Sequence, residues 1–374
     1  MRVLIAPDSF KGSLGAIDVA RELAGGWLAE RPGDRVTQLP LADGGEGTLD
    51  VMAAAVPEAR WHRELVTGPV GAPVSSRWLE FSGGTAVVEL AECCGITRLP
   101  RGDSGEPRLA PMQAHTAGLG EVLGCALDHR AGRIMVTVGG SASTDGGTGA
   151  LAALGARFLG VSGQPLPLGG GALAGLAAVD LTAQRPPPVG GVQCLTDVTA
   201  PLLGPHGAAA VYGPQKGADR DQAARLEAGL ARLAAVLGGD PDAPGAGAAG
   251  GTGYGLATAW DAQLILGAPE LCRLAGLYQQ LATADLVITG EGRFDQTSLT
   301  GKICGTVIGA AAAAGVPVAL VAGQVSGAPP EVARVITLAG LAGSTAPALA
   351  SPGRWLREAG RLLARDRDFR ADPE

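Results

Sequence analysis

The segment from Gly139 to Gly149 has the highest density of residues that could contact a ligand. Glycines, hydroxyl residues and Asp145 lie there between an apolar run at 134–138 and an alanine- and leucine-rich run at 150–154. Glycine allows a backbone to approach a ligand closely, and amide groups at the start of a helix bind anions. We therefore expect Gly140, Ser141, Asp145 and Gly146 to contact a phosphate or a carboxylate. A tight strand-to-helix turn without a ligand is the alternative.

Two charged loops near the N-terminus each follow a short apolar or alternating run. The first contains Asp8, Ser9 and Lys11, and its lysine could neutralise a phosphate or carboxylate as a mobile point charge. In the second, Asp43 and Glu46 surround Gly44 and Gly45, and such paired acids could hold Mg²⁺. The alternatives are a solvated lysine beside a helix cap in the first loop and a capping carboxylate in the second.

A third charged segment, from Gly290 to Lys302, follows an apolar run. It carries Glu291, Arg293, Asp295 and Lys302, a set suited to metal and phosphate binding. It resembles a phosphate-binding Walker loop only in its final Gly-Lys, since Gln296 stands where that motif needs glycine. A salt-bridged surface turn is the alternative.

Two further residues could take part in chemistry, and one motif is excluded. Asp197 ends a predicted strand and is a candidate base or metal ligand, whereas Lys216 precedes a charged helix and is a candidate phosphate contact. The stretch 245–250 matches the dinucleotide pattern G-x-G-x-x-G, but turn-forming residues precede it instead of a strand. An NAD-dependent dehydrogenase is therefore disfavoured.

Composition limits the class of protein. Hydrophobic residues make up 46% of the 374 residues but aromatic residues only 3%, which favours α/β layers built from Ala, Val, Leu and Ile. The net charge of −7, without a large basic cluster, argues against nucleic-acid binding. Six cysteines without C-x-x-C spacing indicate a reducing compartment. With no signal peptide and with a glycine-proline break in the uncharged stretch 303–323, we expect a cytoplasmic protein without a membrane span.

The order of elements predicts two α/β domains. Both ends of the chain alternate strand, polar loop and helix, as open parallel sheets do, with expected strands at 3–6, 35–39, 286–289, 317–322 and 334–338. Residues 61–90 instead predict an antiparallel meander. We expect a discontinuous parallel-sheet domain of residues 1–69 and 283–374, with a mixed α/β domain of residues 70–282 inserted into it. A cleft between two domains is a common place for a small-molecule site.

Taken in order, these segments closely resemble the type I glycerate kinases from residue 3 to about 325. The matching strings are Ala6–Gly12, Ala42–Thr48, Gly139–Ala142 with Asp145–Gly147, Asp197–Thr199 with Pro201-Leu202, Gly213–Ala218 and Ile288–Arg293.

The resemblance implies ATP-dependent phosphorylation of D-glycerate with Mg²⁺, leaning toward 2-phosphoglycerate as the product. It also implies a flavodoxin-like domain with an inserted α/β domain. On this basis we expect Lys11, Asp197 and Asp295 to be catalytic, with Asp197 the first choice of base and Asp295 the second. Asp43, Glu46 and Glu291 are expected metal ligands. The residues expected to bind substrate or phosphate are Asp8, Ser9, Gly44, Gly45, Gly140, Ser141, Asp145, Gly146, Lys216, Arg293 and Lys302.

The sequence departs from the family pattern at a few positions. Thr144 stands where Asn is usual, Thr297 occupies the position of a usual glutamine, and the segment 115–120 differs from the expected Ser/Thr-rich version. These departures leave room for a kinase of a related small hydroxy acid, or for a non-catalytic glycerate or nucleotide sensor. Oligomer formation is compatible with the sequence.

Overall fold

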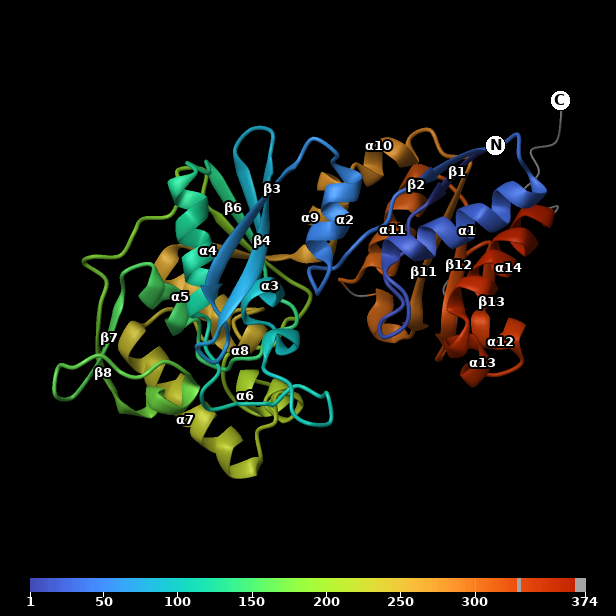
Figure 1. The fold of residues 1–374 in the computed structure, drawn as a ribbon. Helices are drawn as coiled ribbons and strands as arrows, with labels where there is room; N and C mark the ends of the chain where they lie inside the picture. Colours follow the sequence, from blue (N-terminus) through green and yellow to red (C-terminus); the bar gives the residue numbers. More distant parts are fainter. Residues whose placement is uncertain (300, 328–330, 367–374) are drawn as a thin grey trace. The chain divides into compact units, whose positions relative to one another are not determined.

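The computed structural model describes residues 1–299, 301–327 and 331–366. These residues form two compact units (Figure 1). The first consists of residues 1–43, 50–57 and 268–374, and the second of residues 44–49 and 58–267. Thr300 of the third charged segment and the expected domain's last residues, 367–374, lie outside the described residues.

The first unit has a five-stranded, wholly parallel sheet in the order β13-β12-β11-β1-β2. Numbered along the chain this is the 2-1-3-4-5 order of flavodoxin-like sheets. The strands are β1 (Arg2–Ile5), β2 (Arg35–Gln38), β11 (Leu286–Phe294), β12 (Val318–Val325) and β13 (Arg334–Thr337). The expected α/β class with a flavodoxin-like parallel sheet is therefore confirmed.

Both faces of this sheet are covered by helices, as a parallel sheet requires. Val3 and Ile5 of β1 face a core shared with α1 (Ala16–Glu30) and α14 (Pro352–Arg365). Leu4 points to the opposite face, into a core shared with α9 (Gly267–Leu274), α10 (Leu277–Leu281) and α11 (Ile303–Ala314). The unit also contains most of α2 (Thr48–Ala55), together with η4 (Gln296–Leu299), α12 (Leu338–Ala342) and α13 (Thr345–Ala350).

The second unit has a six-stranded mixed sheet in the order β10-β9-β6-β5-β4-β3. The expected meander is present as the antiparallel strands β3 (Arg60–Thr67), β4 (Pro73–Phe81) and β5 (Thr85–Glu89). Strands β6 (Arg133–Thr137), β9 (Val192–Thr196) and β10 (Ala262–Leu266) continue from β5 in parallel. A separate pair, β7 (Arg157–Gly160) and β8 (Leu176–Asp180), completes the strands described in this unit.

The helices of the second unit bury one large apolar core around Trp78, Leu123, Val136 and Leu230. They are α3 (Leu90–Cys94), α4 (Ala117–Asp128), α5 (Thr148–Ala153), α6 (Ala208–Tyr212), α7 (Arg220–Leu237) and α8 (Ala248–Trp260), with the 3₁₀ turns η1 (Ile96–Arg98), η2 (Gly170–Gly175) and η3 (Pro214–Lys216). The first turn of α8 is kinked, because residues 249–251 have positive φ.

Three boundaries differ from the sequence-based expectation. β11 runs through Phe294 instead of ending at 289, because residues 290–294 stay paired with β12; Glu291 and Arg293 are thus strand residues. The second unit takes in β3, which pairs with β4, and so begins at 58 instead of 70. At its other end, α9 and α10 contribute to the core of the first unit, which moves the boundary from 282 to 267.

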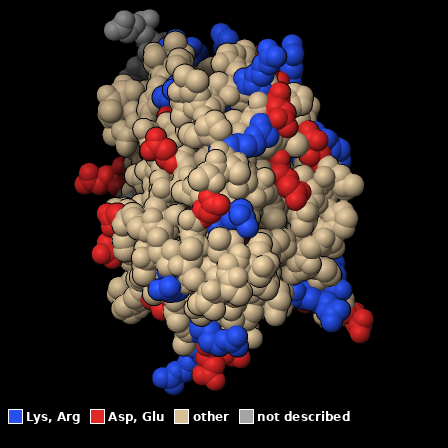
Figure 2. Space-filling model, turned by 90° about the vertical axis from the view of Figure 1, so that its left-hand side faces the viewer, with Lys and Arg blue, Asp and Glu red and all other residues tan. Residues whose placement is uncertain are grey.

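The surface charges and the uncharged stretch both bear on the class of protein expected from composition. On the face shown in Figure 2, the described basic and acidic side chains are interspersed, without a broad patch of one sign. The stretch 303–323 folds as α11 followed by most of β12. Within the part of the chain that the structure describes, every helix is too short or too polar to span a bilayer.

Candidate functional site

A cavity of about 400 Å³ lies in the first unit at the carboxyl ends of β1, β11 and β12. Ligands of open α/β sheets bind at this edge because the strand order reverses there, between β1 and β11. The cavity collects eight of the residues singled out from the sequence, which come from all three charged segments: Asp8, Ser9, Lys11, Asp43, Glu291, Arg293, Asp295 and Lys302.

Asp8 is the most perturbed acid in this cavity. Its side chain follows β1, is buried, and accepts a hydrogen bond of 2.6 Å from the backbone amide of Ser9. Burial, and next the neighbouring carboxylate of Asp43, raise the pKa of Asp8 to about 7. A carboxyl group with this pKa exchanges protons near neutral pH.

Glu291 is a second buried acid, held on β11. Burial raises the pKa of its carboxyl group. Its Oε1 atom is buried and has no hydrogen-bond partner among the described residues. A buried carboxylate oxygen without a partner is costly unless a ligand or ion satisfies it. Glu291 therefore marks a point at which the cavity is built to receive a donor or a cation.

The cations of the cavity are held in two different ways. Lys11 is mostly exposed and reaches Asp43, with 3.2 Å between Nζ and Oδ2. Lys302 donates to the hydroxyl of Thr297 at 3.2 Å, and that hydroxyl donates to Asp295 Oδ1 at 2.6 Å. Thr297, one of the departures from the family pattern, thus links two expected site residues.

Hydrogen bonds within its own turn stabilise the ionised form of Asp295. The Thr297 hydroxyl, and next its backbone amide, lower the pKa of Asp295 by hydrogen bonding. Because these hydrogen bonds stabilise its ionised form, Asp295 is a weaker proton acceptor than Asp8.

The glycine-rich segment 139–149 lies in the second unit and uses its carboxylate internally. Asp145 is fully buried and accepts hydrogen bonds from the amide and hydroxyl of Thr116, at 2.9 and 2.8 Å, and from the amides of Gly147 and Gly149, at 3.3 and 3.2 Å. Gly146 has φ of 64° and packs against α7. Asp145 therefore holds the loop and the start of α5 in shape.

The backbone of this segment makes close approaches that only glycine permits. A Cβ on Gly139 would lie 2.7 Å from the Cα of Gly45, and Gly140 has φ of 72°. Ser141 is buried, with its hydroxyl 3.3 Å from that of Ser143. Thr144, the other departure, is fully buried and its hydroxyl has no partner among the described residues.

Lys216 is buried beside the same segment. Its Nζ donates to the carbonyl oxygen of Ser143, and a Cβ on Gly250 would lie 3.0 Å from this nitrogen. Burial lowers the pKa of Lys216 to about 8, although Asp145 acts in the opposite direction. Unlike Lys11, this side chain is not a mobile surface cation; it supports the loop from within.

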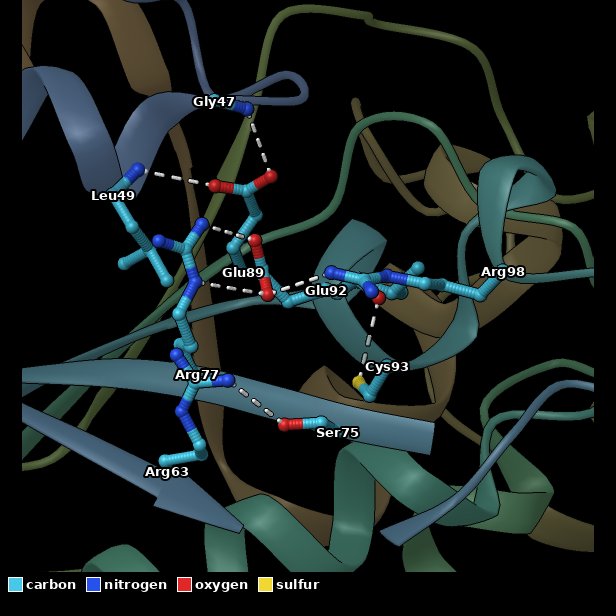
Figure 3. A network of polar contacts seen from close by, with 10 residues as sticks. Gly47, Leu49, Arg63, Ser75, Arg77, Glu89, Glu92, Cys93 and Arg98 are labelled. Atoms are coloured by element: carbon cyan, nitrogen blue, oxygen red, sulfur yellow. Dashed lines mark hydrogen bonds and ion pairs between the residues drawn. The ribbon is translucent and has the colours of Figure 1, made fainter. Parts of the chain in front are cut away.

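Glu89, which the sequence reading missed, positions the second charged loop. Its two carboxylate oxygens accept hydrogen bonds of 3.0 Å from the amides of Gly47 and Leu49 (Figure 3). Glu92 nearby accepts from Arg77 and Arg98, at 2.7 and 2.8 Å. An acid at the end of the buried run Thr85–Glu89 was the available signal, since such a group needs a partner.

The remaining expected residues lie in the second unit. Gly44 has φ of 101°, and Gly45 accepts a hydrogen bond of 2.7 Å from the hydroxyl of Thr48. Glu46 is exposed, and it belongs to a different unit from Asp43. Asp197 is half-buried after β9 and raises the pKa of Tyr212, an effect smaller than that of burial.

The flavodoxin-like sheet and its charged cavity define an α/β protein suited to a small anionic ligand. Comparison with known proteins makes this assignment more specific. Residues 3–367 match the sequence model of the glycerate kinase family. The chain belongs to the glycerate kinase family.

Individual relatives support the same assignment over most of their length. A glycerate kinase of Bacillus subtilis (strain 168) is 41% identical over 337 residues, which cover 87% of this chain and 86% of that protein. A glycerate 2-kinase of Escherichia coli (strain K12) is 38% identical over 312 residues, covering 81% and 80%. A crystal structure of a Salmonella typhimurium LT2 protein assigned as glycerate kinase 2 superposes with a TM-score of 0.80 at 35% identity, and covers 97% of each chain.

Proposed function

We propose that this protein transfers the γ-phosphoryl group of ATP to a hydroxyl group of D-glycerate, with 2-phosphoglycerate as the product. The supporting observation is the cavity of the first unit, which combines buried carboxylates with three cationic side chains. Phosphoryl transfer requires positioned positive charge around the phosphate and an acceptor for the hydroxyl proton. Family membership and the glycerate 2-kinase of Escherichia coli support the choice of substrate and product.

The cations of the cavity have the role of charge neutralisation in this proposal. Lys11 is exposed and flexible, so its ammonium group can move from Asp43 to a phosphate oxygen. Arg293 and Lys302 line the same cavity and can oppose the negative charge of phosphate or of the glycerate carboxylate.

Asp8 is the proton acceptor in this proposal. It is buried in the cavity and its pKa of about 7 suits proton transfer at neutral pH. Asp295 is less suited because its pKa is lowered. Asp197, the first choice from the sequence, is kept as a candidate that substitution tests directly.

The residues present fit a magnesium ion bound together with a nucleotide. Asp43 and Glu291 would hold it, because both are buried acids of the cavity and Glu291 Oε1 has no other partner among the described residues. Among the described residues, no three acids of this cavity lie close enough together to hold a metal ion by themselves. Mg²⁺ does not need such a set, because it commonly takes one or two carboxylates plus waters and phosphate oxygens. The ion would neutralise charge on the transferred group.

One coupled assay tests the proposal. Protein, ATP, Mg²⁺ and D-glycerate are supplied, and product is followed through enolase with and without phosphoglycerate mutase. We expect signal without the mutase, which identifies 2-phosphoglycerate; signal only with the mutase would identify the 3-phosphate. Thermal stabilisation by ATP and glycerate without ADP release would instead favour a sensor. ADP release with another hydroxy acid alone would change the assigned substrate.

Substitution of the two candidate bases separates their roles. We expect Asp8→Asn to lower kcat by about 10²-fold or more, the usual contribution of a general base, and Asp197→Asn to lower it less. The reverse order would assign the base to Asp197. Asp18→Asn, which removes an exposed carboxylate from α1, is the matched control.

A further inference from the structure

Three side chains of the second unit form a cluster that the proposed function does not use. His62, Glu80 and His129 each offer one ligand atom, and these atoms all lie within 4.8 Å of one another. Among the described residues, this is the one group in which three His, Cys, Asp or Glu side chains lie close enough together to hold a metal ion. None of these three residues lines the charged cavity of the first unit.

The fold brings these residues together from three separate segments. In the antiparallel pairing of β3 with β4, His62 is opposite Trp78 and Glu80 is two residues further along β4. Side chains two positions apart on a strand share one face, so His62 and Glu80 are diagonal neighbours. His129 directly follows α4, the helix that packs beside β3 (Figure 1).

Aromatic packing fixes the orientation of both imidazole rings. The His62 ring stacks on Trp78, with 4.0 Å between ring centroids and 11° between planes, and Trp78 is fully buried. The His129 ring meets the His62 ring edge-on, with 4.5 Å between centroids. Since the rings are already ordered, a ligand would lose little free energy in arranging them.

The cluster is also reachable from solvent. The side chains of His62 and Glu80 are 18% and 29% exposed, and His129 is exposed. Nε2 of His62 lies 2.9 Å from Oε2 of Glu80. This contact joins two of the three residues, and edge-on packing against His62 and Trp78 holds the His129 ring beside them.

We propose that His62, Glu80 and His129 bind a divalent transition-metal ion of the Zn²⁺ type. Two imidazoles and one carboxylate are a donor set that zinc uses with a water in the fourth position. Tetrahedral bonds of this kind put ligand atoms about 3.4 Å apart. The His62–Glu80 pair, at 2.9 Å, would open slightly, and the other separations, which are at most 4.8 Å, would close toward that value. His129 stands at the carboxyl end of α4, whose dipole favours a cation there. Arg60 stands opposite Glu80 in the strand register, and its positive charge opposes binding of a cation.

Calorimetric titration of the full-length, metal-free protein with ZnCl₂ tests the site. We expect one Zn²⁺ per chain, with affinity lowered at least about tenfold by Glu80→Gln and by His129→Ala. Both changes keep His62 and Trp78 themselves, and His129 is exposed, so both variants should fold, which circular dichroism checks. Mg²⁺ at millimolar concentration should not displace the Zn²⁺ ion, because Mg²⁺ prefers oxygen ligands and this site offers two imidazole nitrogens.

Two controls distinguish this site from adventitious binding. His206→Ala removes an exposed histidine elsewhere in the unit, and Cys125→Ser removes the half-buried thiol one turn before His129. Both variants should bind Zn²⁺ with unchanged affinity. Wild-type protein loaded with Co²⁺ should absorb visible light without a sulfur-to-cobalt charge-transfer band, because the proposed site has no thiol ligand. Two results would overturn the proposal. One is equal Zn²⁺ affinity in the wild type, Glu80→Gln and His129→Ala. The other is no binding when about 10 µM wild-type protein meets a 100-fold excess of Zn²⁺, since sites of micromolar affinity fill under these conditions.

Discussion

Lys11 and Asp43 form an ion pair between one exposed and one buried partner. Nζ lies 3.2 Å from Oδ2, yet the lysine side chain is 69% exposed and that of the aspartate only 6%. The chain contains only three lysines: Lys11 and Lys302 line the cavity, and Lys216 supports the glycine-rich segment. Lysine is therefore used where a compact, mobile or titratable cation is needed, and arginine supplies the other positive charges.

The first prediction concerns the mobile cation. We expect Lys11→Ala to lower kcat by about 10²-fold, since a charge that acts mainly on the transition state contributes to turnover. Steady-state kinetics with ATP and D-glycerate would measure it. Arg21→Ala removes an exposed, ion-paired cation from α1 and should leave kcat unchanged. Turnover equal to that of the wild type would remove Lys11 from the mechanism.

The second prediction concerns the stability of the metal-free protein as a function of pH. The pKa of Asp8 is raised from 3.8 to about 7 by burial and by Asp43. Between these values the folded state keeps a proton that the unfolded chain has lost, so Asp8 lowers the unfolding free energy progressively as pH rises through this window. Above pH 7 the whole cost is present.

Asp8→Asn should therefore be more stable than the wild type in EDTA, with an advantage that grows from pH 5 to pH 8. We expect a rise in Tm of a few degrees at pH 8, together with the loss of turnover proposed above. Differential scanning fluorimetry at both pH values measures it, with Asp18→Asn as the control. An advantage that is the same at pH 5 and pH 8 would show that Asp8 does not titrate in this range.

Periodicity was sufficient to predict the parallel sheet, and the charged segments noted in the sequence supply residues that line the cavity, although the sequence-based expectation was a cleft between two domains. Val3, Leu4 and Ile5 are continuously apolar because the strand is buried on both faces, and polar loops after such strands meet at one edge. The expected end of β11 at 289 was wrong because Gly290 and Gly292 indicated a loop, whereas backbone pairing with β12 continues past both.

The internal use of buried polar groups could not be predicted from the sequence. Asp145 and Lys216 have the composition of ligand-binding residues, but whether a carboxylate faces a cavity or is surrounded by backbone amides depends on tertiary packing. Thr116, which supplies two of the donors to Asp145, lies 29 residues away in the chain. Glu89 was missed for the same reason, since its partners are about 40 residues distant.

The third prediction separates a structural role of Asp145 from a ligand-binding one. Asp145→Ala leaves the amide and hydroxyl of Thr116 and the amides of Gly147 and Gly149 without their acceptor. We expect the unfolding free energy to fall by about 3 kcal/mol or more, measured by urea denaturation. The exposed Asp103→Asn should change it by less than about 0.5 kcal/mol. A variant of normal stability that has lost only affinity for glycerate or ATP would instead show that the carboxylate binds ligand.

The fourth prediction uses the buried lysine. Burial lowers the pKa of Lys216 from 10.5 to about 8. As pH rises from 8 toward 10, the unfolded chain retains a proton that the folded state has lost, so this residue makes the unfolding free energy rise with pH. Lys216→Met removes that contribution while filling most of the same volume.

Relative to the wild type, Lys216→Met should therefore be most stable at pH 7 and should lose ground as pH increases to 10. Urea denaturation of both proteins at pH 7, 8.5 and 10 gives the difference in their unfolding free energies. Buried cysteines and tyrosines titrate in both proteins alike, so their contribution cancels from this difference. Arg225→Met removes an exposed positive charge from α7 and controls for loss of charge alone. If the difference between Lys216→Met and the wild type stays constant over this range, the buried ammonium group keeps its proton. The hydrogen bond to Ser143 would then outweigh the cost of burying the charge.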